Sequence, residues 1–275
     1  MRLVRAELLK IRSTNTWWTF GLIALGLWAV TLFFNYIQTQ FLVGPDATTG
    51  MNAEQAEQMR AAAEPVSLAA NLYTNGQFLG LVIVLVLGVL VVTNEFHHQT
   101  VTTTFLTTPH RTAVVVAKLV AAALLGVLFW AVTTGLNLLT GPLILSGFDV
   151  ANQFDSGEVW QAVWLNGLAY LLWAIFGVGF GVLIRSQIGA TVTAILLYFA
   201  GFIGAAIFFN TLASRFGDWI NDLQVLVPSL ASQLMVSAVE LPSQPPQWLG
   251  AVVLIGYAVV TAGIGTLLIR KRDIS

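Results

Sequence analysis

The sequence predicts an all-α membrane protein with six transmembrane helices, and three observations lead to this. The chain of 275 residues is 57% hydrophobic and only 9% charged, whereas a soluble domain usually carries about 25% charged residues. Its charge-free stretches are long enough to cross a hydrocarbon core, which takes about 20 apolar residues. These stretches lack the alternation of polar and apolar residues that transmembrane β-strands show. We therefore expect helices, in which the backbone hydrogen bonds form within each span. The predicted spans are residues 17–37, 76–93, 119–143, 159–184, 189–209 and 248–269.

The first segment, residues 1–14, is predicted to be a cytoplasmic amphipathic helix. Val4, Leu8 and Ile11 share one helical stripe, while arginines and a lysine occupy the polar side. Such a helix can anchor the chain on anionic lipid or dock a cytosolic partner. The apolar run that follows is too long for a cleaved signal peptide and has no Ala-x-Ala site after it, so it is interpreted as an uncleaved first span.

The distribution of lysine and arginine predicts that both termini lie in the cytoplasm. With the amino terminus inside, all of the 12 basic residues except Arg60 and Arg215 fall on the cytoplasmic side. An even number of spans then returns the carboxyl terminus, with its run of Arg270, Lys271 and Arg272, to the same side.

Two segments between the spans are predicted to lie outside the cell. Residues 46–64 are polar and rich in Ala, Glu and Gln, which indicates a short helix that ends before Pro65. Residues 210–247 contain an apolar run that Pro228 interrupts and that is marginal in length for a span. We therefore expect a re-entrant or interfacial segment before the sixth helix, in a chain that forms a single domain over residues 1–275.

The sequence argues against several classes of function. The predicted spans carry no ionisable residue at mid-membrane depth, which disfavours proton-coupled antiport and a charged channel filter. No phosphate-binding Gly-x-x-x-x-Gly-Lys-Ser/Thr motif is present, so the chain is not expected to hydrolyse nucleotide itself. No metal site is expected, because the chain has no cysteine and His97 and His98 point about 100° apart on a helix. No catalytic residue or bound cofactor is predicted.

The segment of residues 94–112, NEFHHQTVTTTFLTTPHRT, is predicted to join the second and third spans in the cytoplasm. Val101, Phe105 and Thr108 are spaced i, i+4, i+7, which gives a helix with a partly apolar stripe that could enter a groove on a partner. The segment resembles the one after helix two in the permease subunits of type-2 ABC exporters, where an acid, a basic turn with Gly-Thr, an apolar helix and then Pro, Arg and Lys are typical. The residues in those places here are Glu95, Thr100, Val101, Phe105, Leu106, Pro109, Arg111 and Lys118, with His97 where Arg is usual and Gln99 where Gly is usual.

The resemblance covers the whole chain and implies the permease subunit of an ATP-driven exporter in the cell membrane. Two permease chains, identical or homologous, would form a dimer in membrane lipid, with ATP and Mg held by separate ATPase subunits and no nucleic-acid partner. Pro228 and Ser229, a Pro-Ser pair before the last span, would belong to an extracellular gate. The implied partner-coupling residues are Glu95, Val101, Phe105, Thr108, Arg111, Val4, Leu8 and Ile11.

A substrate pathway between two such bundles would be lined by apolar, aromatic and hydroxyl groups, which suits an amphiphile such as a drug, an antibiotic or a lipid-like molecule. Candidate pathway residues are Phe34, Asn137, Asn166 and Tyr198, although core packing explains them equally well. Two alternatives stay open. One is a non-transporting membrane scaffold or sensor, and the other is an integral membrane enzyme with Glu95, His97 and His98 as its polar cluster.

Overall fold

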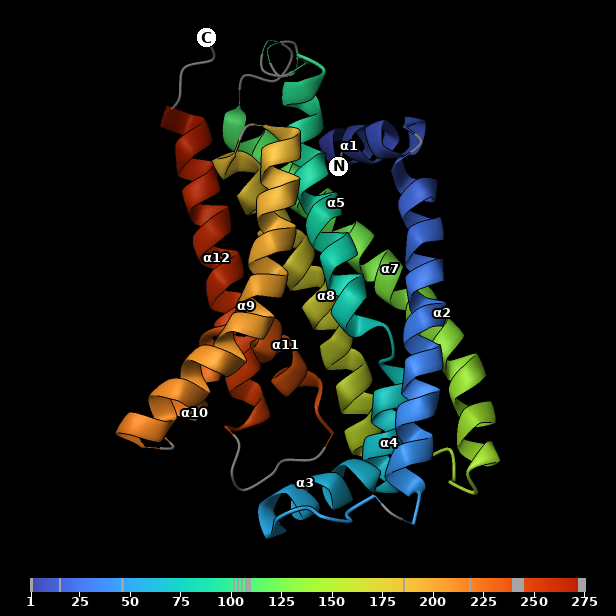
Figure 1. The fold of residues 1–275 in the computed structure, drawn as a ribbon. Coiled ribbons are helices and arrows are strands. Elements are labelled where there is room, and N and C mark those ends of the chain that lie inside the picture. Colours follow the sequence, from blue (N-terminus) through green and yellow to red (C-terminus); the bar gives the residue numbers. More distant parts are fainter. Residues whose placement is uncertain are drawn as a thin grey trace.

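The computed structural model (Figure 1) describes residues 2–14, 16–45, 47–100, 102, 104, 106, 110–184, 186–217, 219–238 and 245–271, and these residues form helices and connecting turns without a strand. The α-helices are α1 (Arg2–Ser13), α2 (Thr16–Val43), α3 (Ala53–Ala63), α4 (Pro65–Tyr73), α5 (Gln77–His97), α7 (Arg111–Gly147), α8 (Gly157–Leu183), α9 (Gln187–Phe216), α10 (Trp219–Asp222), α11 (Pro228–Val236) and α12 (Gln247–Lys271). A short 3-10 helix, η1 (Leu223–Leu226), connects α10 to α11.

Six stretches of these helices are long and apolar enough to cross a membrane, which confirms the prediction of an all-α, multi-pass membrane protein. Most spans are longer than predicted, because polar ends such as the first turn of α7 continue the helix beyond its apolar part. The second span also includes α4, whereas the predicted span begins only at residue 76. The six stretches are Trp17–Val43, Pro65–His97, Arg111–Gly147, Gly157–Leu183, Gln187–Phe216 and Gln247–Leu268.

Helix α8 is the centre of the bundle and packs against α5, α7 and α12. Glycines let the backbones of α5 and α8 touch. A Cβ atom added to Gly88 of α5 would lie 2.2 Å from the carbonyl oxygen of Ala174, and one added to Gly177 of α8 would lie 2.1 Å from that of Leu85. Because lipid gives helices no hydrophobic reason to associate, close contact at small residues is what holds such a seam together.

Helices α2 and α9 lie on the outside of the bundle, where few of their side chains are buried. Large apolar side chains stay exposed along both of them, for example Leu22 and Phe33 on α2 and Ile207 on α9. In a membrane these side chains contact lipid tails, or another chain, instead of water.

The two ends of the bundle differ in the short helices that cover them. Helix α1 crosses one end, where the last turn of α12 also lies, and α3 crosses the opposite end (Figure 1). We call these the α1 end and the α3 end. Placing the α1 end in the cytoplasm rests on the distribution of basic residues and stays a prediction.

Between α9 and α12, the described part of the chain forms α10, η1 and α11 instead of a seventh span. Pro228 is the first residue of α11, where its missing N–H breaks no helical hydrogen bond. Helix α11 packs against α8, α9 and α12, closely enough that a Cβ atom on Gly250 would lie 2.4 Å from the carbonyl oxygen of Ala231. Its predicted re-entrant or interfacial depth in the membrane stays a prediction, and residues 239–244 lie outside the described part.

Candidate functional site

Four charged residues from three helices meet at the α1 end. They are Glu7 and Lys10 of α1, Glu95 of α5 and Lys118 of α7, and we call them the charge cluster. Glu7, Glu95 and Lys118 are 6%, 6% and 4% exposed, so three of the four charges are removed from water.

Each ammonium group of the charge cluster contacts both carboxylates. Lys118 donates from Nζ to Glu7 Oε2 at 2.8 Å, lies 2.9 Å from Glu95 Oε1 and also donates to the carbonyl oxygen of Val91 at 3.1 Å. Lys10 donates from Nζ to Glu7 Oε1 at 2.8 Å and to Glu95 Oε1 at 2.5 Å. Two acids and two bases leave no net charge, which is the condition under which buried charges are tolerated. The charge cluster therefore fastens α1 to α5 and α7.

Lys10 is the solvent-facing member of the charge cluster, with 47% of its side chain exposed. Partial burial acts to lower its pKa, but the hydrogen bonds and charges of Glu7 and Glu95 outweigh this, so the pKa of Lys10 is raised above its ordinary value. The ammonium group accordingly stays protonated at neutral pH.

The chain turns sharply directly after the charge cluster. The N–H of Thr100 donates to the carbonyl oxygen of Glu95 at 2.9 Å, and the N–H of Gln99 donates to that of Phe96 at 3.3 Å. These two bonds form a Schellman motif, which needs a left-handed residue just past the helix. Gln99 takes that conformation, with φ 56°, at the position where glycine is usual in the resembled family.

The predicted coupling residues near this turn are placed only in part. Glu95 belongs to the charge cluster, and Arg111 is the first residue of α7. Val101, Phe105 and Thr108 lie outside the described residues. That these five residues contact a partner stays a prediction.

Helix α1 presents a bundle face and an outer face. The predicted coupling residues Val4, Leu8 and Ile11 are partly buried, and Ile11 packs against the apolar core. The outer face instead carries Arg5, Leu9 and Arg12, spaced i, i+4, i+7, with Leu9 53% exposed. A partner that approaches α1 from outside the bundle therefore contacts Leu9 between two arginines. The predicted stripe of Val4, Leu8 and Ile11 does not include this surface.

About midway between the two ends, beside the middle of α2, the second span is interrupted (Figure 1). Helix α4 ends at Tyr73 and α5 begins at Gln77. Gly76 lies between them with φ +83°, a conformation that glycine adopts without steric cost. Such a break frees backbone groups, which at membrane depth need partners from within the protein.

Asn137 of α7 supplies hydrogen-bond donors for the backbone carbonyl groups at this break. Its Nδ2 donates to the carbonyl oxygens of Tyr73 at 3.1 Å and Asn75 at 2.9 Å. Its Oδ1 accepts a hydrogen bond from Trp28 Nε1 of α2 at 2.6 Å. Asn137 is 1% exposed, so a single buried carboxamide ties the interrupted span to α2 and α7.

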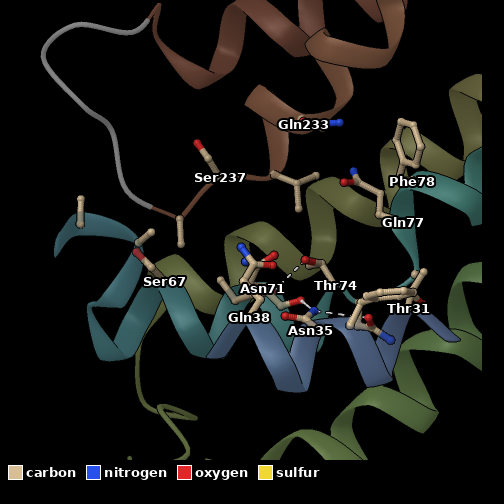
Figure 2. Close-up of a pocket in the computed structure, with 18 of the residues that line it drawn as sticks. Thr31, Asn35, Gln38, Ser67, Asn71, Thr74, Gln77, Phe78, Gln233 and Ser237 are labelled. Carbon is tan, nitrogen blue, oxygen red and sulfur yellow. Dashed lines mark hydrogen bonds between the residues drawn. The ribbon is translucent and has the colours of Figure 1, made fainter. Parts of the chain in front are cut away.

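A cavity of about 560 Å³ opens beside the break, between α2, α3, α4, α11 and the start of α5. Figure 2 shows Asn35, Gln38 and Asn71 grouped on one side and Gln233 and Ser237 across from them. The described residues that line the cavity include carboxamides, hydroxyls and apolar groups, and none of them is charged.

The predicted pathway residues are spread over the bundle. Phe34 lines the cavity, and Asn137 holds the break next to it. Tyr198 is buried and donates from its hydroxyl to the carbonyl oxygen of Phe78 at 2.8 Å. Asn166 is buried on α8, with no hydrogen-bond partner for its Oδ1 among the described residues. A role in transport stays a prediction for all four.

The predicted gate residues Pro228 and Ser229 form the first turn of α11. The carbonyl oxygen of Pro228 accepts a hydrogen bond from Ser232 at 2.7 Å. Ser229 is 2% exposed. Ser232 also accepts a hydrogen bond from Trp173 Nε1 at 2.7 Å, which anchors α11 to α8. The gate function itself stays a prediction.

The described residues hold no group of three or more His, Cys, Asp or Glu side chains placed to bind a metal ion. The rings of His97 and His98 lie 5.0 Å apart and are exposed, whereas the neighbouring Glu95 is buried in the charge cluster. The three residues proposed for an enzyme site therefore occupy different environments.

Comparison with known proteins places the chain in a family without giving a function. The model of the family described as "Protein of unknown function (DUF2705)" matches residues 51–275. Because this match covers most of the chain, the protein belongs to that family. No curated protein matches the chain.

Proposed function

We propose that this member of the DUF2705 family is the permease subunit of an ATP-driven exporter, which moves an amphiphilic molecule across the cell membrane and is powered by separate ATPase subunits at its α1 end. The observation that carries the proposal is the charge cluster, because it makes α1 a rigid part of the bundle. The resemblance of residues 94–118 to the segment after helix two of type-2 ABC exporter permeases supports the same function.

Burying charges has a cost that a simple surface anchor would not need to meet. A helix that only rests on lipid is held by its apolar face and by attraction to anionic head groups. The buried carboxylates and ammonium group of the charge cluster each lose hydration that is worth several kcal/mol, and good geometry is needed to offset this loss. A firm joint between α1, α5 and α7 is useful if a partner pushes on α1, since α5 continues into the close α5–α8 seam.

The outer surface of the α1 end has the chemistry of a docking site. Leu9 is exposed between Arg5 and Arg12 on α1, and Leu106, in the segment that follows α5, is 79% exposed. An apolar side chain between two positive charges fits an apolar groove with acidic residues beside it on a partner. The basic residues also favour the cytoplasm for this end, where ATP is available.

The energy source in this proposal is the partner, because the chain has no phosphate-binding loop of its own. A second permease chain, identical or homologous, would cover part of the apolar surface that α2 and α9 leave exposed. The alternative function, a non-transporting scaffold or sensor, would use the same docking surface. ATP hydrolysis by the bound partner distinguishes the exporter from this alternative.

The proposal is tested by purifying the tagged chain from its native membranes in mild detergent. We expect a P-loop ATPase, identified by mass spectrometry, to co-purify in a fixed ratio and to hydrolyse ATP. Leu9→Asp should release this subunit without lowering the melting temperature, because Leu9 is exposed. Ala53→Asp, which introduces the same charge at an exposed residue of α3 at the opposite end, serves as the control and should retain the ATPase subunit.

Two results would count against the proposal. If no nucleotide-hydrolysing protein accompanies the unchanged chain, the exporter function fails and the scaffold or sensor reading gains. If the ATPase stays bound to the Leu9→Asp variant, the docking surface has been placed on the wrong face.

A further inference from the structure

The cavity at the α3 end carries free hydrogen-bonding groups. Within the described part of the chain, the carboxamides of Gln38, Gln58, Asn71 and Gln233 line the cavity and make no side-chain hydrogen bond. By contrast, Asn35 donates to Asn75 Oδ1 at 3.3 Å, so some carboxamides of the wall are already in use. The free groups come from α2, α3, α4 and α11 and surround one space.

The unused groups favour an uncharged ligand that is rich in hydroxyls. Each carboxamide offers both a donor and an acceptor, and a hydroxyl does the same, so neighbouring hydroxyls can pair with neighbouring carboxamides. An ionic head group would find no opposite charge among the described lining residues. Charge would therefore bring a desolvation cost without a matching ion pair.

The apolar part of the wall suits a sugar ring. Phe34 and Phe78 both line the cavity, and the negative face of an aromatic ring attracts the slightly positive C–H face of a sugar. The ring of Phe78 is held in place by Phe202 and Tyr198, at centroid distances of 4.7 and 5.2 Å. The cavity volume of about 560 Å³ falls in the range of small-molecule sites, roughly 300–1,000 Å³.

The interrupted span is a second, independent reason to expect a ligand here. Thr74, Asn75 and Gly76, the residues of the break, all line the cavity. Irregular backbone at membrane depth is tolerated where it is buried in protein or lines a polar cavity, and broken helices of transporters form substrate sites in this way. The break and the free carboxamides therefore mark the same place.

We propose that this cavity binds the uncharged, hydroxyl-rich head group of an amphiphile, such as that of a neutral glycolipid. The exposed apolar side chains of α2 next to Phe34, among them Phe33 and Phe41, give its tail a path along the bundle surface. The inference deepens the proposed function and rests on it for the claim that the ligand is transported. Binding itself requires no ATPase.

The test uses the absence of native cysteines. Ser237→Cys places a single thiol at the cavity wall without removing any of the free carboxamides, and Asp155→Cys places one at the same end outside the cavity. Both variants are reconstituted, without sugar-based detergent, in nanodiscs of phosphatidylglycerol and phosphatidylethanolamine, and their rates of reaction with a water-soluble maleimide are measured. Adding diglucosyl diacylglycerol to the nanodiscs should slow labelling several-fold at Ser237→Cys and leave it unchanged at Asp155→Cys.

A matched pair on α2 checks the carboxamides. Gln38→Ala, combined with Ser237→Cys, should abolish the protection, because the Gln38 carboxamide lines the cavity and is free to bind the ligand. Gln40→Ala, two residues further along α2 and exposed on the other side of the helix, should retain it. If the Gln40 variant loses protection as fully as the Gln38 variant, the assignment of the site is wrong.

The remaining outcomes are equally decisive. Protection by free maltose as well would support the head-group chemistry and show that the lipid tail is dispensable. Equal protection when extra phosphatidylglycerol replaces the glycolipid, or no protection by any of these probes, would overturn the proposal. Since no ATPase is present in the nanodiscs, these results bear on the cavity alone, whereas failed co-purification bears on the exporter function alone.

Discussion

The two ends of the bundle use polar side chains in opposite ways. At the α1 end, the charge cluster pairs every charge with opposite charges at 2.5 to 2.9 Å. At the α3 end, the cavity is lined by neutral carboxamides, and several of them have no partner among the described residues. The first arrangement fixes helices in place, while the second leaves hydrogen-bonding capacity for something else.

The physical reason for the difference is the cost of an unpaired group. A buried charge that loses its partner costs several kcal/mol, so a charge cluster can only serve as a permanent joint. A carboxamide at an open cavity can exchange a water molecule for a ligand at little cost. Under the proposed function, the α1 end would transmit force from the ATPase and the α3 end would bind the transported molecule.

The largest effect is expected from removing Lys118. Lys118→Met leaves Glu7 and Glu95 buried with only the half-exposed Lys10 to balance them, and it should lower the free energy of unfolding by about 3–5 kcal/mol. Lys10→Met removes the same charge from a half-exposed position and should cost less, because water can take the place of its ammonium group beside the two carboxylates. Denaturant unfolding in detergent measures both, and equal losses would show that the charge cluster is not a buried joint.

A smaller loss is expected at the break in the second span. Asn137→Leu removes the partner of two backbone carbonyls and of the Trp28 N–H, and it should lower the free energy of unfolding by about 1–3 kcal/mol. Asn166→Leu is the control, since Asn166 is equally buried but its Oδ1 has no partner within the described residues. The comparison fails if the Asn166 variant is the less stable of the two.

Gln99, after the charge cluster, and Gly76, at the break, both have left-handed backbone conformations, and their substitutions should act in opposite directions. Gln99→Gly relieves a side chain held at φ 56° and should stabilise the fold by up to about 1 kcal/mol. Gly76→Ala introduces a side chain at φ +83° and should destabilise it by about 1–2 kcal/mol. Melting temperatures of the two variants provide the check, and a shift of the same sign in both would contradict the assigned turn geometry.

The smallest effect is expected from the free carboxamides of the cavity. Gln38→Ala should change the free energy of unfolding by no more than about 0.5 kcal/mol, because the side chain is exposed and unpaired among the described residues. A loss as large as that of Lys118→Met would mean that the cavity wall is structural and would remove the contrast between the two ends.

The sequence predicted the six spans because they depend on length and composition, which a local reading captures. It could not predict the charge cluster, because pairing Glu7 with Lys118 depends on how α1 lies across α7. The bundle face of α1 shows the same limit. The stripe of Val4, Leu8 and Ile11 is visible in the sequence, but whether it faces a partner or the protein itself is decided by packing.

The break between α4 and α5 has a local pattern in the sequence that predicts a turn. Asn75-Gly76 is a typical turn pair, but it stands directly before a long apolar run, and the predicted second span simply begins at residue 76. The short helix predicted within residues 46–64 ends before Pro65, and Pro65 is also the first residue of α4. The cavity could not be foreseen, because its lining comes from segments as distant in the chain as Gln38 and Gln233.

The central claim is that a push at the α1 end reaches the cavity at the α3 end, and this can be measured without knowing the substrate. The Ser237→Cys chain is reconstituted with its co-purified ATPase, and the rate of maleimide labelling is followed with and without ATP. We expect ATP to change the labelling rate, and we expect Glu7→Gln, which breaks the charge cluster, to abolish that change in complexes that still bind and hydrolyse ATP. A labelling rate that does not respond to ATP, or a response that survives Glu7→Gln, would contradict the account.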